Sequence, residues 1–250
     1  MTLIRSALLA LYMAVLTVPY AFIAMACAPL PPMARYKVIS GWARIVMVGV
    51  RFITGIRHTV LGAERMPAQP AVALVKHQSA WETIALQCIL PPQCYVLKKE
   101  LLKLPFFGWG LAQMPNVAID RAAGRDALDQ VVNQGKDRLS EGFWVIVFPE
   151  GTRVPVGTHK RYKVGGAQLA AATGVPVVPI AHNAGEFWPR NAFVKRPGTI
   201  TVSIGPTIAS EGRTAAQITR EAEAWIEGEM QRLFPHHYVG GKGESGSSPA

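Results

Sequence analysis

The sequence has little charge and few cysteines, and it lacks the motifs of several common functional classes. Charged residues make up only 17% of the 250 residues, and there is no zinc-finger pattern, aromatic RNA-binding box or dense Lys/Arg tract. Nucleic-acid binding is therefore disfavoured in spite of a net charge of +10. The three cysteines form no Cys-x-x-Cys pair and no Cys/His cluster at metal-ligand spacing. We expect them to be packed thiols in a reducing compartment, with no metal bound.

Two catalytic signatures are also missing. There is no Gly-x-Ser-x-Gly elbow, which argues against a serine hydrolase. The segment GWGLAQ (108–113) lacks the third glycine of the dinucleotide-binding fingerprint. The surplus of 26 Lys+Arg over 16 Asp+Glu instead suits anionic lipid or a phosphate-bearing substrate.

The N-terminal segment is long and apolar. No charged side chain occurs from Ser6 to Leu30, which is enough chain to cross the hydrocarbon core of a bilayer. Pro19 falls near its middle, so we expect either a kinked span or a helix that dips into the membrane and bends. A cleaved signal peptide is the alternative, because Arg5 precedes the apolar run and AMA at 24–26 resembles a cleavage site.

Basic residues then recur every seven positions, at Lys37, Arg44, Arg51 and His58. On a helix this spacing drifts by only about 20° per step, so the four side chains form one cationic stripe on an otherwise apolar helix. Such a helix is typical of the lipid headgroup region. A second, tilted span is the alternative, although Lys and Arg are costly at its centre. We therefore predict a membrane anchor and interfacial helix over residues 1–60.

Residues 61–238 alternate β-type and helical segments, and a Gly/Ser-rich tail expected to be flexible follows over 239–250. Strands are predicted at 71–75, 94–98, 144–148, 175–181 and 199–205, and helices at 83–90, 125–141, 164–173 and 214–233. The strands are apolar and barely alternate, which is typical of parallel strands covered on both faces. We predict an α/β fold: a mostly parallel central sheet covered by helices, preceded by the membrane-associated segment. Functional loops should follow the carboxyl ends of the strands.

One such strand end carries a His, a Ser and a Glu, in KHQSAWET (76–83). Ser79 and Glu82 form Ser-x-x-Glu, the capping box that satisfies N–H groups at a helix start. His77 also has the position of a general base, with Glu82 to orient it. Both interpretations can hold together, and the residues alone leave them open.

A second strand end carries FPEGTR (148–153). Gly151 permits a close backbone approach, Thr152 offers a hydroxyl group, and Arg153 has the planar fork that suits a phosphate. Glu150 adds a carboxylate to the same loop.

Two further cations, Lys98 and Arg121, lie in strand-to-loop segments, and LPFFGWG (104–110) is apolar. Together with Arg153 they predict a basic pocket that is reached through an apolar approach. A lipid phosphate needs this combination of polar groups for its head and apolar walls for its chains.

The motifs together resemble those of the glycerolipid acyltransferases, specifically the 1-acyl-glycerol-3-phosphate acyltransferase family that makes phosphatidic acid. KHQSAWE resembles the family's His-x4-Asp motif, NVAIDR (116–121) its second motif, FPEGTR its third and VPVVPIA (175–181) its fourth. Their order and spacing agree over residues 71–181. The departure is Glu82, where the family usually has Asp; Glu is one methylene longer and can still accept a hydrogen bond from the imidazole.

The resemblance implies transfer of a fatty acyl group from an acyl thioester, acyl-CoA or acyl-carrier protein, to the free hydroxyl of 1-acyl-glycerol-3-phosphate. His77 and Glu82 are the implied catalytic pair, and N–H groups of a helix start near Ser79 are expected to stabilise developing charge. The implied substrate-binding residues are Lys98, Arg121, Glu150, Gly151, Thr152 and Arg153. No cofactor is expected beyond the thioester co-substrate.

The expected location is the inner (cytoplasmic) membrane, with the catalytic domain facing the cytoplasm, because basic segments favour that side. Expected partners are membrane lipid, the lysophospholipid acceptor and the thioester donor, without nucleic acid. Three alternatives stay open: another acceptor such as lyso-ornithine lipid, a hydrolase that uses Ser79, and a non-catalytic lipid-binding membrane protein.

Overall fold

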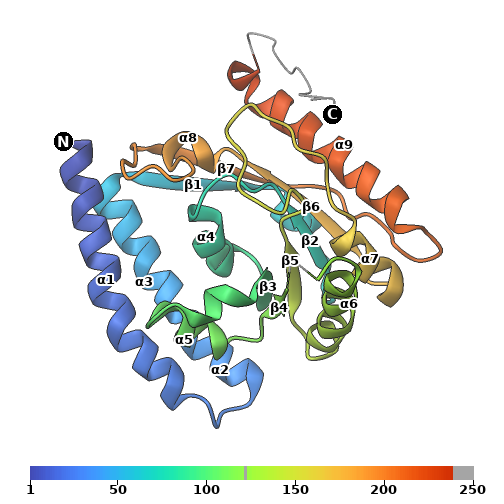
Figure 1. Cartoon of the computed structure of the whole chain (residues 1–250). Coiled ribbons are helices and arrows are strands. Elements are labelled where there is room, and N and C mark those ends of the chain that lie inside the picture. The colour runs from blue at the N-terminus through green and yellow to red at the C-terminus, as the bar shows by residue number, and fades with distance from the viewer. Residues whose placement is uncertain (121–122, 239–250) are drawn as a thin grey trace, which may run out of the picture.

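The computed structural model describes residues 1–120 and 123–238. At its centre is a seven-stranded sheet with the order β1-β7-β6-β2-β5-β3-β4 (Figure 1). The strands are β1 (Ile56–Leu61), β2 (Val72–Val75), β3 (Gln93–Lys98), β4 (Val117–Ile119), β5 (Trp144–Val147), β6 (Val177–His182) and β7 (Gly198–Ile204). Neighbouring strands are parallel, except that β6 and β7 are antiparallel. The predicted, mostly parallel sheet is confirmed.

Helices cover both faces of this sheet. They are α1 (Thr2–Ala26), α2 (Pro32–Ile39), α3 (Gly41–Gly49), α4 (Trp81–Ile89), α5 (Phe107–Ala112), α6 (Arg125–Ser140), α7 (Gly165–Thr173), α8 (Ala184–Phe187) and α9 (Ala215–Leu233). Figure 1 shows α6, α7 and α9 together on one side of the sheet, and α1, α3, α4 and α5 on the other. The predicted helical covering of the sheet is therefore present.

Strand β2 shows why such a sheet needs strands that are apolar throughout. Ala73 and Val75 pack in the core on the side of α4, whereas Val72 and Leu74 pack in the core on the side of α7. Successive side chains of a strand point to opposite faces, so a strand between two cores has no polar face. All four residues of β2 are buried.

The predicted basic helix ends earlier than expected. After α3 comes one π-helical turn, Val50–Thr54, and the helix then ends at Gly55, whose φ of 77° is a left-handed conformation that glycine adopts at low cost. Strand β1 follows, so His58 lies on a strand and the helical part of the cationic stripe is limited to Lys37, Arg44 and Arg51. The predicted boundary at residue 60 falls inside β1, which pairs with β7.

In the described part of the chain, α1 is the one helix long and apolar enough to cross a membrane. It is nevertheless attached to the sheet domain at separate points along its length. Near its start, the Ser6 hydroxyl accepts a hydrogen bond from the Lys195 backbone N–H at 2.8 Å. Further along, the indole N–H of Trp42 on α3 donates to the Thr17 hydroxyl at 3.2 Å. One face of α1 is therefore part of the folded domain.

Candidate active site

The sheet topology brings the two predicted functional loops together. Strands β2 and β5 are parallel neighbours, so their carboxyl ends lie at the same edge of the sheet. His77 follows β2, and the loop over 148–154 follows β5. Lys98 ends β3, the next strand beyond β5. Residues that are far apart in the sequence therefore meet at one edge.

His77 and Glu82 form a close pair. The Nδ1 atom of His77 lies 2.8 Å from Oε1 of Glu82, and the Glu82 side chain is fully buried. The same oxygen accepts the backbone N–H groups of Gln78 at 2.9 Å and Ser79 at 2.7 Å. Because an ionised carboxylate can only accept, the imidazole proton lies on Nδ1, and Nε2 is the nitrogen left to take a proton.

The surroundings keep the Glu82 carboxylate ionised. Burial by itself raises the pKa of Glu82, but the neighbouring His182 and the hydrogen bond from His77 oppose this effect. The backbone N–H of Ser79 acts in the same direction, so the pKa of Glu82 lies below its ordinary value. Glu82 can therefore hold the imidazole in one tautomer and stabilise it when it becomes positively charged.

The predicted capping box at this helix start is only half formed. Helix α4 begins at Trp81, and the Ser79 hydroxyl accepts from the Trp81 N–H at 3.1 Å. Glu82 does reach back to the Ser79 N–H, so it serves as cap and as partner of His77 at once. The N–H groups of Gln78 and Ser79 donate to Glu82, and that of Trp81 donates to the Ser79 hydroxyl, so these three are not free to stabilise developing charge.

The loop after β5 contacts both the ring and the backbone of His77. The imidazole stacks on the Phe148 ring, with centroids 3.9 Å apart and planes inclined by 17°. The His77 carbonyl accepts from the Val154 N–H at 2.8 Å, and the His77 N–H donates to the Glu150 carboxylate at 3.4 Å. The ring, the carbonyl and the N–H of this one residue are thus all contacted by the 148–154 loop.

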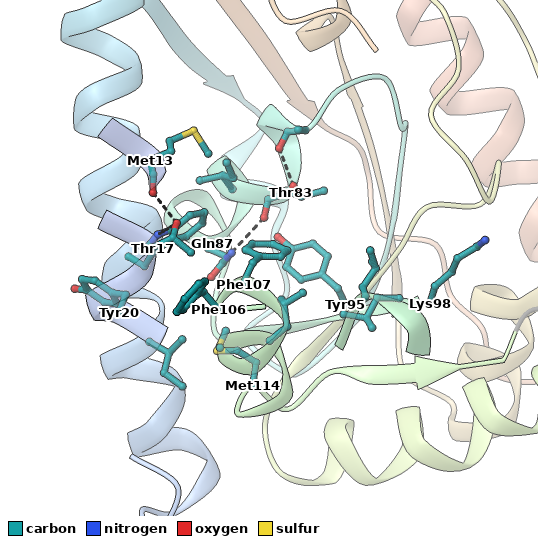
Figure 2. Close-up of a pocket in the computed structure, with 18 of the residues that line it drawn as sticks. Met13, Thr17, Tyr20, Thr83, Gln87, Tyr95, Lys98, Phe106, Phe107 and Met114 are labelled. Carbon is teal, nitrogen blue, oxygen red and sulfur yellow. Dashed lines mark hydrogen bonds between the residues drawn. The ribbon is translucent and has the colours of Figure 1, made fainter. Parts of the chain in front are cut away.

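A mostly apolar cavity of about 350 Å³ opens beside His77. Its walls come from α1, α4, β3 and α5, and Figure 2 shows Met13 and Thr17 of α1 across from Phe106, Phe107 and Tyr95. Lys98 lies at the end away from α1 (Figure 2), and Arg153 also borders the cavity. Of the predicted binding residues, Lys98 and Arg153 therefore meet at the same cavity as the predicted base.

Three other predicted binding residues, Glu150, Gly151 and Thr152, lie elsewhere. The Glu150 carboxylate is fully buried outside the cavity wall, where Oε1 lies 3.4 Å from Nζ of Lys76. Gly151 and Thr152 are half-buried and stand outside that wall, as far as the described residues form it. Gly151 has a φ of 70°, so the turn favours glycine here. Arg121 lies outside the described residues.

Sequence reasoning missed two parts of the site. One is α1, whose Met13, Thr17, Tyr20 and Ala21 line the cavity; its uniform apolar character carried no signal of which face would pack. The other is Lys76, which is fully buried although it directly precedes the base. A charged residue at the end of a buried strand was a usable signal, because a buried charge requires partners.

A second cavity of about 460 Å³ lies behind the same loops, with Gln78 and Val154 in its wall. Glu186, His236 and His237 offer ligand atoms there that lie within 4.8 Å of one another, as a metal site requires. Both imidazoles already face the Glu186 carboxylate, with His237 Nε2 at 3.1 Å. Arg190 and Arg196 border the same cavity. Their positive charge disfavours a cation in this second cavity.

Comparison with known proteins defines the class. A protein-family model described as Acyltransferase matches residues 57–183. The chain is 47% identical over 210 residues to the 1-acyl-sn-glycerol-3-phosphate acyltransferase of Pseudomonas aeruginosa. This alignment covers 82% of each of the two chains. It is 29% identical over 203 residues to the human 1-acyl-sn-glycerol-3-phosphate acyltransferase alpha, covering 80% of this chain and 71% of the human protein.

The fold agrees with a solved structure. The crystal structure of the 1-acyl-sn-glycerophosphate (LPA) acyltransferase PlsC from Thermotoga maritima superposes with a TM-score of 0.76 over 93% of this chain and 98% of that chain, at 23% identity. That likeness concerns the fold. The family match and the 47% identical relative show that the chain belongs to the acyltransferase family and is an enzyme.

Proposed function

We propose that this enzyme transfers a fatty acyl group from an acyl thioester to the free hydroxyl of 1-acyl-glycerol-3-phosphate, giving phosphatidic acid for phospholipid synthesis. The observation that carries the proposal is the His77–Glu82 pair at the wall of an apolar cavity that Lys98 and Arg153 also border. The names of the relatives at 47% and 29% identity support the same acceptor.

His77 acts as the general base. Nε2 takes the proton of the acceptor hydroxyl while the hydroxyl oxygen attacks the thioester carbonyl carbon. The carbon–sulfur bond then breaks, and the proton passes from the imidazolium to the leaving thiolate. Glu82 keeps the Nδ1 proton in place throughout and stabilises the imidazolium. No covalent enzyme intermediate is required, and the Ser79 hydroxyl already accepts a hydrogen bond from the Trp81 N–H.

The cavity matches the two parts of the acceptor. Arg153 is suited to bind the phosphate through two parallel hydrogen bonds, and Lys98 adds a second positive charge. The apolar walls take an acyl chain. Arg121, Gly151 and Thr152 stay in the proposal as binding residues on the strength of the family motifs. The donor is proposed to be acyl-CoA or acyl-carrier protein.

We further propose that α1 binds the enzyme to the membrane. Six apolar side chains at helical spacing are exposed along one stripe of α1: Ile4, Leu8, Leu11, Val15, Val18 and Phe22. The opposite face of α1 packs on the domain. Without a membrane, this apolar stripe would be exposed to water. Because contacts with the domain occur along its length, a helix lying in one leaflet fits better than one that leaves the domain to span the bilayer.

The proposed location is the cytoplasmic face of the inner membrane. Lys37, Arg44 and Arg51 are exposed near α1, where they can meet anionic headgroups. Basic segments favour the cytoplasmic side, where the thioester donors are made. Protease protection in sealed membrane vesicles tests this orientation: residues 60–238 should be cut only from the cytoplasmic side.

An acceptor panel tests the function. The purified enzyme is given acyl-CoA or acyl-carrier protein together with 1-acyl-glycerol-3-phosphate, lyso-ornithine lipid or a lysophospholipid without a terminal phosphate. We expect the highest kcat/KM with 1-acyl-glycerol-3-phosphate, and phosphatidic acid as the product. A higher kcat/KM with lyso-ornithine lipid would replace the proposed acceptor, and hydrolysis of thioester without transfer would replace the reaction.

A further inference from the structure

A buried cluster of charges lies directly behind His77. Nζ of Lys76 lies 2.7 Å from Oε1 of Glu227 on α9 and 3.4 Å from Oε1 of Glu150. It also donates to the Thr158 carbonyl at 3.2 Å. The Lys76 and Glu150 side chains are fully buried, and that of Glu227 is 15% exposed. Removing such charges from water is unfavourable unless partners compensate, so the cluster needs all its members.

The cluster is connected to the base through the backbone. Oε1 of Glu150, the atom that faces Lys76, also accepts the His77 N–H at 3.4 Å. Lys76 is itself the residue before His77, so both groups that contact this oxygen belong to the chain segment that carries the imidazole. The Val154 N–H completes the connection from the same loop by donating to the His77 carbonyl at 2.8 Å.

Removing Lys76 would take its positive charge away from both carboxylates of this cluster. Two carboxylates, Glu150 and Glu227, face one ammonium group, and the Tyr162 hydroxyl donates to Glu227 at 2.8 Å. Burial raises the pKa of Glu150 to about 7, while Lys76 acts to lower it. An ionised carboxylate accepts a stronger hydrogen bond from the His77 N–H than a neutral carboxyl group does. Lys76 thus controls how firmly Glu150 holds the base.

We propose that Lys76, Glu150 and Glu227 form a positioning unit that holds His77 in place for proton transfer, and that Glu150 acts on the base rather than on the acceptor. The inference rests on the proposed function and adds residues to it. Helix α9, on the opposite side of the sheet from α4, reaches the active site through this unit. A misplacement of about 1 Å at a reacting group can cost about 100-fold in rate, so the unit should influence kcat.

The test replaces Lys76 by Met, which is close in length and uncharged. We expect kcat to fall about 10- to 100-fold, with KM for 1-acyl-glycerol-3-phosphate within about twofold of wild type, because the cavity wall is untouched. The acid limb of the pH–kcat curve should move to higher pH, since Glu150 loses the charge that lowers its pKa. Lys136→Met, which removes an exposed Lys from α6, is the matched control and should change neither quantity.

A rescue variant separates positioning from stability. Lys76→Met/Glu227→Gln removes one uncompensated carboxylate along with the ammonium, so it should recover part of the lost kcat. A folded Lys76→Met protein with the kcat and pH curve of wild type would overturn the proposal. If Lys76→Met does not fold, Glu227→Gln decides, since it must lower kcat at unchanged KM.

A wild-type enzyme that is inactive toward every acceptor would instead contradict the proposed function. In that case the positioning unit is tested by treating the protein with an acylating reagent and following the modification of His77 by mass spectrometry. The rate of this modification must differ between wild type and Lys76→Met.

Discussion

Nδ1 of His77 lies 2.8 Å from Oε1 of Glu82, an oxygen that also accepts two backbone N–H groups. Replacing Glu82 by Gln removes the charge that stabilises the imidazolium, while the amide oxygen can still accept the two backbone N–H groups. We expect Glu82→Gln to lower kcat by about 10²-fold or more. Glu82→Asp keeps the charge and should retain more activity than Gln. A Gln variant that loses stability at wild-type kcat would leave capping as the only role of Glu82.

Arg153 is expected to bind the acceptor phosphate. Arg153→Ala should raise KM for 1-acyl-glycerol-3-phosphate about 10-fold or more, because a charge-assisted hydrogen bond contributes about 1.5–3 kcal/mol. KM for a lysolipid acceptor without the terminal phosphate should change little. Steady-state kinetics with both acceptors checks this difference. Equal losses on the two acceptors would show that Arg153 does not select the phosphate.

Glu150 should make stability depend on pH. Its pKa is raised from 4.5 to about 7 by burial, so the folded state keeps this proton where the unfolded state has lost it. The folded state is therefore favoured below pH 4.5 and loses about 3 kcal/mol as pH rises to about 7. Glu150→Gln cannot titrate. Its free energy of unfolding, relative to wild type at the same pH, should rise between pH 5 and pH 8.

Urea unfolding of both proteins at the two pH values measures this difference. Other titrating groups are shared by the two proteins and cancel in the comparison. A relative stability that is equal at pH 5 and pH 8 would mean that Glu150 titrates in its ordinary range.

Strands and their loops were the part of the fold that the sequence predicted well. The run VALV of β2 is buried on both faces and needs no context to be recognised as a central strand. The order of apolar strands and helices in the sequence then predicted that His77 and Arg153 follow strand ends. The edge strand β1 was missed for the same physical reason: its Arg57, His58 and Thr59 are exposed, so its pattern is not apolar.

The roles of individual side chains were harder to predict. Thr214 and Gln217 form a complete capping box at α9, yet the same pattern at Ser79 and Glu82 gives only half of one. The difference arises because His77 lies next to Glu82, a contact that depends on the loop conformation. Glu150 was predicted to bind substrate. Its burial against Lys76 depends on α9, more than 70 residues further along the chain.

The exposed stripe of α1 should determine binding to membranes. Leu11→Glu/Val15→Glu places two negative charges on that stripe without touching the packed face. We expect less of this variant to float with anionic vesicles, and its activity on vesicle-borne acceptor to fall more than its activity on a short-chain, water-soluble acceptor. Ala216→Glu/Arg220→Glu adds acidic residues at exposed positions of α9 and is the control. Equal flotation of the α1 variant and wild type would contradict a membrane role for this face.

His77 is proposed to be the general base of acyl transfer, and the kcat of His77→Ala is the decisive measurement. His159 supplies a matched control, because it also pairs with a glutamate, Glu223, at 2.6 Å, but lies outside the cavity. Transfer from acyl-CoA to 1-acyl-glycerol-3-phosphate is measured for both alanine variants, with folding checked by thermal unfolding. We expect kcat to fall about 10²- to 10⁴-fold for His77→Ala and to stay nearly unchanged for His159→Ala. A folded His77→Ala enzyme that turns over like wild type would contradict the proposed role of His77.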